Sequence, residues 1–206
     1  MTDTATEEDY YKTIDREGVA EFKDRGSRFI AYTFPIQNTD EFKSRLLQLK
    51  KEHVKAVHHC FAYRLGLDKN NFRSSDDGEP SGSAGKPILG QIDSKGLTNV
   101  LIVVVRYFGG TLLGVPGLIN AYKSAAALAL QVVPVIQKPV TSGLKINFGY
   151  GEMNDVMRTI KQFNATIIHQ ELNLFCHIEI EVERNKLLNI KQTLSHIYGV
   201  EIVDQL

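Results

Sequence analysis

The amino-acid sequence predicts an α+β protein made of two domains, and three observations support this prediction. Six consecutive apolar residues at 100–105 are typical of a buried central strand, and an Ala- and Leu-rich helical pattern follows at 114–133. The segment 132–143 then carries two prolines outside any periodic pattern, which favours a domain boundary. Beyond it, the hydrophobic pattern has the order βαββαβ of a ferredoxin-like domain. At 206 residues, 43% of them hydrophobic, the chain is long enough to build two small cores.

The first domain opens with strands and a capped helix. Residues 22–37 alternate around a turn signal at 24–27, as two strands or one bent strand would. Asn38 then offers an N-cap, and Glu41 stands three residues later as its capping-box partner. This spacing predicts a helix through about Lys55.

The segment HHCFAYRLGL, residues 58–67, alternates as a strand. One broad face should pack in the core, and a smaller, more polar face is a possible working face. The broad face comprises His59, Phe61, Tyr63, Leu65 and Leu67, and the smaller one His58, Cys60, Ala62 and Arg64. Farther on, Pro87 suits the first turn of a short helix through about Lys95, because its missing N–H is not needed there.

The second domain should place one face of a long strand against its core. In the strand 174–183 we expect alternate residues to face inward, namely Leu174, Cys176, Ile178, Ile180 and Val182. Three glutamates then face outward with Phe175 and His177, and they would repel phosphates. Because the basic-aromatic signature of an RNA-recognition strand is also absent, we exclude RNA recognition by this sheet face. The remaining elements are expected as strands at 144–148, 166–171 and 200–203 and helices at 152–163 and 186–198.

These patterns divide the chain into a frayed tail (1–15), an N-terminal domain (16–135), a linker (136–142) and a C-terminal domain (143–206). The linker should be the first site of limited proteolysis, between Pro134 and Ser142. The acidic, polar start does not match a signal peptide, and no apolar run is long enough to cross a membrane, so we expect a cytoplasmic protein. Two cysteines, Cys60 and Cys176, are too few for a disulfide framework or a zinc site, and we expect buried thiols.

Charge is unevenly distributed although the formal net charge is zero. A neutral total argues against a protein that coats nucleic acid through a strongly basic surface. Residues 10–140 nevertheless hold 18 Lys and Arg against 12 Asp and Glu, an excess of six positive charges, whereas residues 141–206 hold 6 against 8. If the protein contacts phosphate, the first domain should make the contact.

Several familiar chemistries are not supported. The segment GEPSGSAGKP is not a Walker motif, because that motif needs Gly at position 80 and Ser or Thr at position 87, and both positions are Pro. The acids Asp76, Asp77 and Glu79 do not match the spacing of a calcium loop. Cys60 and His58 share a strand face, but a free cysteine on a strand is more often a small apolar filler than a nucleophile. The sequence therefore predicts no metal site, no cofactor and no catalytic residue, and makes a non-enzymatic role the favoured one.

A glycine-rich turn, RYFGGTLLGVPGL at 106–118, leaves the buried strand and enters the long helix. Free N–H groups at the start of a helix attract anions, and glycines allow close approach. Alternatively, the glycines serve only a tight strand-to-helix turn. The polar stretch SSDDGEPSGSAGKPIL at 74–89 is likewise open to two interpretations, a solvated linker that contributes nothing to a core or a surface of defined shape.

Together these blocks resemble the YigZ/IMPACT family. The resemblance rests on KDRGSRFIAY (23–32), HHCFAYRLG (58–66), the stretch 74–89 and VVVRYFGGTLLGVPGLINAYKSAA (103–126), and it covers nearly the whole chain. It implies an N-terminal two-layer α/β domain of the type seen in ribosomal proteins and in domain four of elongation factor G. It also implies a ferredoxin-like C-terminal domain similar to the last domain of that factor. The animal relative is a regulator of translation that competes for the co-activator of a kinase sensing uncharged tRNA, and this chain resembles the two-domain bacterial form.

We therefore expect a binding protein linked to regulation of translation, contacting the ribosome, structured RNA or a translation-associated protein. The alternative is an enzyme or small-ligand protein that holds a phosphate-bearing metabolite at the turn 109–117. We expect Arg106 to be partly exposed and to bind the partner rather than to hold the acidic loop. The suspected binding residues are His58, Arg64, Ser75, Asp76, Asp77, Gly78, Glu79, Lys86, Arg106, Tyr107, Gly109, Gly110, Gly114 and Gly117.

Overall fold

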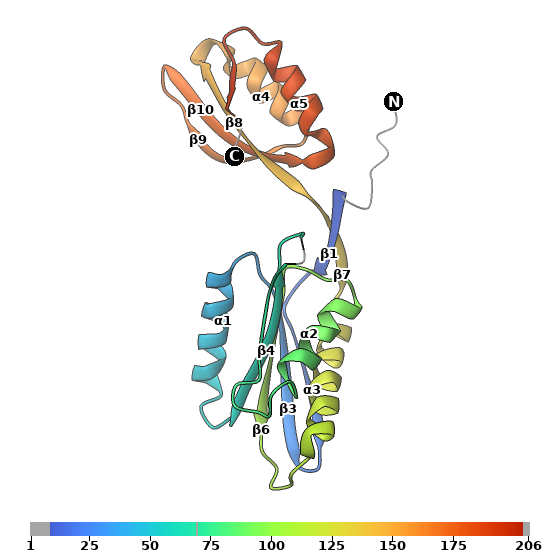
Figure 1. Ribbon diagram of the computed structural model, residues 1–206. Coiled ribbons are helices and arrows are strands. Elements are labelled where there is room, and N and C mark those ends of the chain that lie inside the picture. The colour runs from blue at the N-terminus through green and yellow to red at the C-terminus, as the bar shows by residue number, and fades with distance from the viewer. Residues whose placement is uncertain (1–8, 69, 204–206) are drawn as a thin grey trace. The chain divides into compact units, whose positions relative to one another are not determined.

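The computed structural model describes residues 9–68 and 70–203, and this part of the chain mixes helices with three β-sheets. The mixed α/β class is as predicted. The described residues form two compact units, one of residues 11–138 and one of residues 139–203 with Asp9 and Tyr10 (Figure 1). The ferredoxin-like and elongation-factor labels for the two domains stay predictions.

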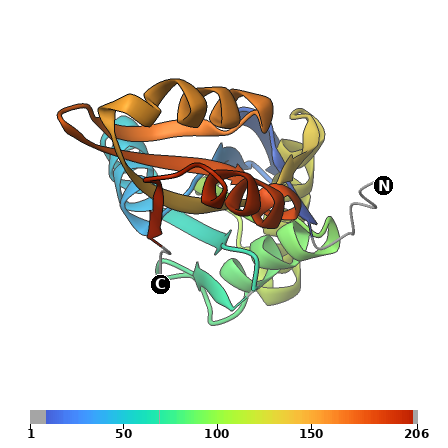
Figure 2. The same ribbon diagram turned by 90° about the horizontal axis from the view of Figure 1, so that it is seen from above.

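The first unit is built on a five-stranded antiparallel sheet in the order β2-β3-β6-β4-β5. Helix α1 lies on one face of this sheet, and α2 and α3 lie on the other (Figures 1 and 2). The unit thus has three layers, one more than the resemblance implies. The strands are β2 (Gly18–Asp24), β3 (Ser27–Pro35), β4 (His58–Leu65), β5 (Asn71–Ser75) and β6 (Val100–Tyr107), and the helices are α1 (Thr39–Glu52), α2 (Gly85–Ser94) and α3 (Gly114–Gln131).

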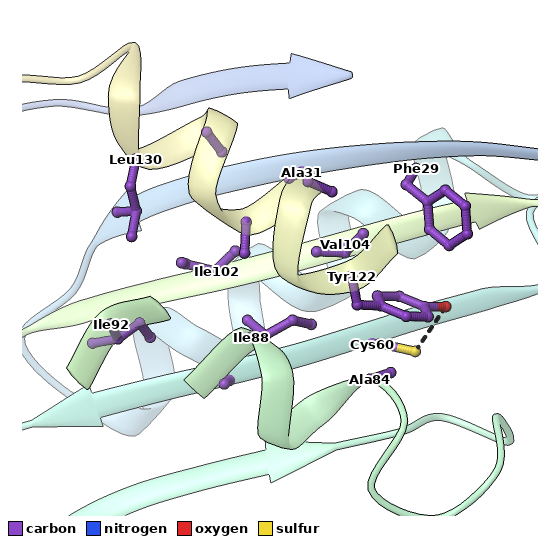
Figure 3. Packing of buried hydrophobic residues seen from close by; sticks show 14 of the residues in the cluster. Phe29, Ala31, Cys60, Ala84, Ile88, Ile92, Ile102, Val104, Tyr122 and Leu130 are labelled. Carbon is purple, nitrogen blue, oxygen red and sulfur yellow. Dashed lines mark hydrogen bonds between the residues drawn. The ribbon is translucent and has the colours of Figure 1, made fainter. Parts of the chain in front are cut away.

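Strand β6 is the central strand, as the apolar run predicts, and its residues alternate between two cores. Val100, Ile102 and Val104 pack against α2 and α3 (Figure 3), whereas Leu101, Val103 and Val105 face α1. Four alanines of α3 are fully buried, and their small side chains let the helix approach the sheet closely. The third layer exists because α1 presents an apolar face of its own, with Phe42 and Leu49 buried.

The predicted cap of α1 is confirmed. The Asn38 Oδ1 accepts the N–H groups of Asp40 and Glu41, at 3.0 and 2.9 Å. Glu41 reaches back to accept the N–H of Gln37 at 2.9 Å. The helix ends at Glu52, three residues earlier than expected. Side chains thus satisfy backbone groups that every helix start leaves without an intrahelical partner.

The second unit has the predicted βαββαβ order, in a four-stranded sheet ordered β11-β8-β10-β9 with α4 and α5 together on one face (Figure 1). Cys176, Ile178, Ile180 and Val182 are buried, as expected. Leu174 is not: it is 85% exposed, because the strand begins one residue later and Leu174 belongs to the preceding turn. The elements are β8 (Thr141–Gly149), α4 (Met153–Gln162), β9 (Thr166–Glu171), β10 (Phe175–Glu183), α5 (Leu187–Ser195) and β11 (Glu201–Val203), with 3-10 turns at Tyr150–Glu152 and Arg184–Lys186.

The expected tail and linker include strands. Part of the expected tail forms β1 (Tyr10–Ile14), which pairs with β7 (Val135–Pro139), a strand that begins at the last residue of the expected N-terminal domain and continues into the expected linker. Ile14 is fully buried in the core beneath α2 and α3, and this burial gives the segment a reason to be ordered. The first eight residues of the expected tail lie outside the described residues.

Two further expectations concern the cysteines and the membrane. Cys60 and Cys176 are both free and buried, as expected. Within residues 9–68 and 70–203, no helix combines the length and the apolar character needed to cross a lipid bilayer.

Candidate functional site

The polar stretch after β5 is held in one conformation by Asp76. Its Oδ1 accepts the N–H groups of Ala84 and Gly85, at 3.0 and 2.8 Å, and its Oδ2 accepts that of Gly82 at 2.8 Å. Burial by itself would raise the pKa of Asp76, but the three N–H donors outweigh it and lower that pKa. Ala84 lies in the core, so the interpretation of this stretch as a solvated linker that contributes nothing to a core is wrong. The carboxylate gathers distant N–H groups into a surface of defined shape.

Asp77 attaches the same loop to β4. Its Oδ2 accepts the N–H of His59 at 2.6 Å, and its carbonyl oxygen lies 2.8 Å from the Nδ1 of His58. Asp77 and Gly78 both have positive φ, 43° and 92°, so the chain reverses in a left-handed turn. Ser75 Oγ accepts the Asp77 N–H at 3.2 Å. The carboxylates of Asp76 and Asp77 are thus engaged with backbone donors. Among the described residues, no three His, Cys, Asp or Glu side chains are placed to share a metal ion.

Glu79 and Arg106 form a buried ion pair. The Nη1 of Arg106 donates to Glu79 Oε1 at 2.6 Å, and the hydroxyl of Tyr122 donates to the same oxygen at 2.7 Å. The guanidinium lies 5.4 Å from the ring centre of Phe29 and 5.7 Å from that of Phe108. Arg106 is only 5% exposed, so the expectation of partial exposure is wrong. The reason is that β6 continues through Tyr107, which keeps Arg106 inside the sheet.

Cys60 belongs to the same buried network. Its Sγ lies 3.0 Å from the carbonyl oxygen of Asp76 and 3.3 Å from the hydroxyl oxygen of Tyr122, so its single S–H has two acceptors within reach. Figure 3 shows the contact with Tyr122. Burial raises the pKa of Cys60 to about 12 and raises that of Tyr122 as well. A thiol with this pKa stays protonated near neutral pH and is a poor nucleophile. The arrangement supports the interpretation of Cys60 as a structural thiol.

A hollow of about 430 Å³ lies between this network and the glycine-rich turn. Its position follows from the sheet, because His58 on β4 pairs directly with Arg106 on β6. Polar side chains form one part of the lining and apolar side chains the rest; Leu112, on the turn, is 83% exposed. The lining residues are Val57, His58, Glu79, Pro80, Arg106, Phe108, Leu112, Leu113, Gly114, Val115 and Leu118.

The glycines of the turn have different tasks. A Cβ on Gly109 would lie 1.9 Å from the carbonyl carbon of Gly26, so only glycine allows this close approach to the β2–β3 hairpin. The Gly109 N–H donates to Ser27 Oγ at 3.1 Å and is therefore not available to an anion. Gly110 and Gly114 have positive φ, 87° and 68°. At Gly109 the tight-turn interpretation accounts for the glycine, whereas α3 starts without a side-chain cap and leaves the anion interpretation open there.

Some suspected residues lie away from the hollow. Tyr107 follows Arg106 on β6 and points to the opposite face, where its hydroxyl lies 2.8 Å from the Nδ1 of His53. Arg64 pairs across the sheet with Val100, six residues along β4 from His58, and its Nη2 lies 2.7 Å from Asp93. Lys86 is exposed on α2, Gly78 lies on the loop, and Gly117 packs on Leu113 within the first turn of α3.

Other residues of the site were not suspected from the sequence. Tyr122 completes the buried network. The sequence could have indicated it, because a tyrosine on the core side of an Ala-rich helix buries a hydroxyl group that needs a hydrogen-bond partner. The apolar lining from Val57, Phe108, Leu112 and Val115 carries no such signal, because exposed apolar residues are common on protein surfaces.

Comparison with known proteins identifies the family. The Impact N-terminal domain matches residues 25–130. An IMPACT family member of Haemophilus influenzae is 31% identical over 87% of this chain and 88% of its own length. The chain belongs to the IMPACT family. YigZ of Escherichia coli, another family member, is 30% identical over 82% of the chain and 84% of its own length. The resemblance to the YigZ/IMPACT family is thereby confirmed.

One solved structure shares the fold of this chain over nearly its whole length. A crystal structure described as that of a hypothetical protein is 26% identical, covers 96% of this IMPACT family chain and 98% of its own, and superimposes with a TM-score of 0.79. Yih1, described as a two-domain translational regulator, covers 65% of the chain at 25% identity and superimposes poorly, with a TM-score of 0.35.

Proposed function

We propose that this IMPACT family chain is a non-enzymatic binding protein linked to regulation of translation. Its partner contact is the loop–turn surface, which we define as residues 75–86, residues 106–118 and the hollow between them. The observation that carries this proposal is a hollow with an apolar rim above polar groups that already bind one another. Such a site is suited to holding a side chain of a partner.

The chemistry of the hollow favours a protein partner. Glu79 already accepts hydrogen bonds from Arg106 and Tyr122, so an entering group meets a polar surface whose charge is compensated. Exposed apolar side chains of the turn, Leu112 above all, would be buried by an apolar anchor, with a gain of about 25 cal/mol per Å² of area removed from water. The membership of the chain in a family with a translational regulator among its relatives supports placing this partner in the translation apparatus.

The test is co-sedimentation of the full chain with purified ribosomes. We expect binding that weakens in Leu112→Ser, because the substitution removes an exposed apolar anchor and nothing from the core. The matched control is Leu47→Ser, the same substitution at an exposed position of α1 on the opposite face of the sheet. This variant should bind as the unmodified chain does. Raising the salt concentration separates the two kinds of partner, since contacts to RNA phosphates weaken steeply with salt and apolar contacts do not. Indifference to ribosomes and to RNA at low salt would overturn the proposal.

A second candidate is a phosphate-bearing metabolite held at the start of α3. The observation that favours it is the uncapped first turn of α3 at the edge of the hollow. A thermal-shift screen against nucleotides and sugar phosphates tests it, because a ligand present at a hundred times its Kd should stabilise the fold by about 2.7 kcal/mol. Reproducible stabilisation by one compound would favour this candidate over the first, provided that adding ribosomes does not abolish the stabilisation.

A further inference from the structure

The open face of the second unit differs in composition from the loop–turn surface. By open face we mean the side of the sheet β11-β8-β10-β9 that is turned away from the core formed with α4 and α5. Residues on this face alternate with the buried ones along β10, and pairing places neighbours from the other strands beside them. One row across the sheet, for example, runs Glu201, Asn147, His177 and Glu171.

Negative charge dominates the open face. The lysines beside this face are already paired: the Nζ of Lys145 lies 2.8 Å from Glu179, whose pKa it lowers, and the Nζ of Lys186 lies 2.9 Å from Glu183. His169 and His177 lie on the same face, 3.2 and 3.3 Å from Glu171 and Glu179. Neither Glu181 nor Glu201 has an ion-pair partner among residues 9–68 and 70–203, and both are exposed. The acidic residues of the face are Glu171, Glu179, Glu181, Glu183 and Glu201.

An exposed aromatic side chain lies at one end of this face. Phe175 begins β10, alternates with the buried Cys176 and is 87% exposed. Phe175, His177 and Glu201 line a hollow of about 390 Å³ together with Gly149 and Gly199. Two unpaired carboxylates and an exposed ring thus belong to one continuous surface.

We propose that the open face binds a Lys- and Arg-rich polypeptide segment of a partner protein. The charge of the face selects a cationic partner, because each unpaired glutamate gains a counter-charge. An exposed ring attracts a guanidinium or an ammonium group and covers its aliphatic stem. Nucleic acid is disfavoured by the same charges, since phosphates would face glutamates. This inference goes beyond the proposed function and does not depend on the loop–turn surface.

The test uses the full chain and a fluorescein-labelled octa-arginine peptide in fluorescence anisotropy. We expect saturable binding that weakens as salt rises. The double variant Glu181→Gln/Glu201→Gln should weaken the affinity about three- to tenfold, because exposed ion pairs contribute modestly. Phe175→Ala should weaken it about two- to fivefold through loss of the cation–π contact. All three substituted side chains are exposed, so the variants should melt as the unmodified chain does.

A second double variant controls for net charge. Asp15→Asn/Glu52→Gln removes the same number of negative charges from exposed positions of the first unit, and its affinity should stay within about twofold of the original. Equal weakening by both double variants would overturn the proposal, and so would absence of peptide binding at low salt. A labelled U-rich RNA tests the alternative partner. If this RNA displaces the peptide and binds more tightly to Glu181→Gln/Glu201→Gln than to the unmodified chain, the face would be assigned to RNA instead. Leu112→Ser should leave peptide binding unchanged, which keeps this test separate from that of the proposed function.

Discussion

Arg106 is a cation enclosed within the first unit and balanced by one carboxylate oxygen of Glu79, 2.6 Å away. Removing one partner of a buried ion pair is costly, because the other charge is left buried without its counter-charge. The geometry therefore favours a structural role for Arg106, holding the loop 76–84 against the sheet, over the partner-binding role that we expected from its place before the glycine turn.

Substitution Arg106→Gln should lower the free energy of unfolding by about 3 to 5 kcal/mol, because it leaves Glu79 buried with Tyr122 as its remaining donor. Urea unfolding measures this loss. Arg158→Gln is the matched control, since that exposed arginine pairs with Asp155 on the surface of α4 and its removal should cost at most about 0.5 kcal/mol.

A double-mutant cycle with Glu79→Gln then isolates the Arg106–Glu79 interaction, and the two losses should be strongly non-additive. The folded fraction of Arg106→Gln should still sediment with ribosomes. Unchanged stability with weakened ribosome binding would show instead that Arg106 serves the partner.

At the scale of elements, the loop after β5 works as a remote cap for α2. The helix begins at Gly85 without a side-chain cap from its own first turn, and the carboxylate of Asp76 takes that place from nine residues upstream. Gly85 is required because a Cβ there would lie 2.7 Å from the backbone nitrogen of Ser75. The loop is thereby bound at both ends, and α2 reaches the sheet closely.

Asp76→Asn should lower the free energy of unfolding by about 1 to 3 kcal/mol near pH 7, because a neutral amide accepts these N–H groups less strongly than a carboxylate and has one acceptor oxygen instead of two. The pKa of Asp76 is lowered in the folded protein, so its stabilising effect is present above the unfolded pKa of about 3.9 and disappears as pH falls through the folded value.

Urea unfolding over a pH series should therefore show a constant difference between Asp76→Asn and the unmodified chain above about pH 5 and a shrinking one below about pH 4. Asp15→Asn, at an exposed position, should show little difference at either pH. A difference that stays constant into acid would mean that the charge of Asp76 contributes nothing.

At the scale of the whole molecule, each unit has a core made of its own side chains. The core of the second unit is formed by β8, β10, α4 and α5, with further contacts from β9 and β11. The core beneath α2 and α3 draws entirely on the first unit, Ile14 and Val133 included. Separate cores are the physical condition for separate folding.

We predict that a fragment of residues 143–206 folds alone. Many domains of about 55 to 65 residues do so, although this is the small end of the size range of independently folding domains. A cooperative thermal transition and a folded near-ultraviolet circular dichroism spectrum would support this. We expect limited proteolysis of the full chain to cut first between Pro134 and Ser142, which requires the two-stranded β1–β7 sheet to open before the larger sheets do. First cuts inside 100–133, or a fragment without a cooperative transition, would contradict the proposed boundary.

The features that the sequence alone determined are those encoded within a few neighbouring residues. The cap at Asn38 depends on a residue three positions away, the burial of β6 on six consecutive apolar side chains, and the order βαββαβ on local periodicity. Family membership also follows from short contiguous blocks, 58–66 and 74–89 among them.

Tertiary structure alone decided what depends on segments far apart. Burial of Arg106 requires Glu79, 27 residues away, and Tyr122 from a helix on the same face. The pairing of β1 with β7 joins the two ends of the first unit, and no local sequence pattern predicts this pairing. The hollow likewise exists only because strand pairing brings distant side chains into register. On the open face, pairing adds Glu171 and Glu201 to the three outward glutamates that the sequence predicted. Local propensity acts over one turn or one strand, whereas burial and charge balance are set by whichever residues the folded chain places nearby.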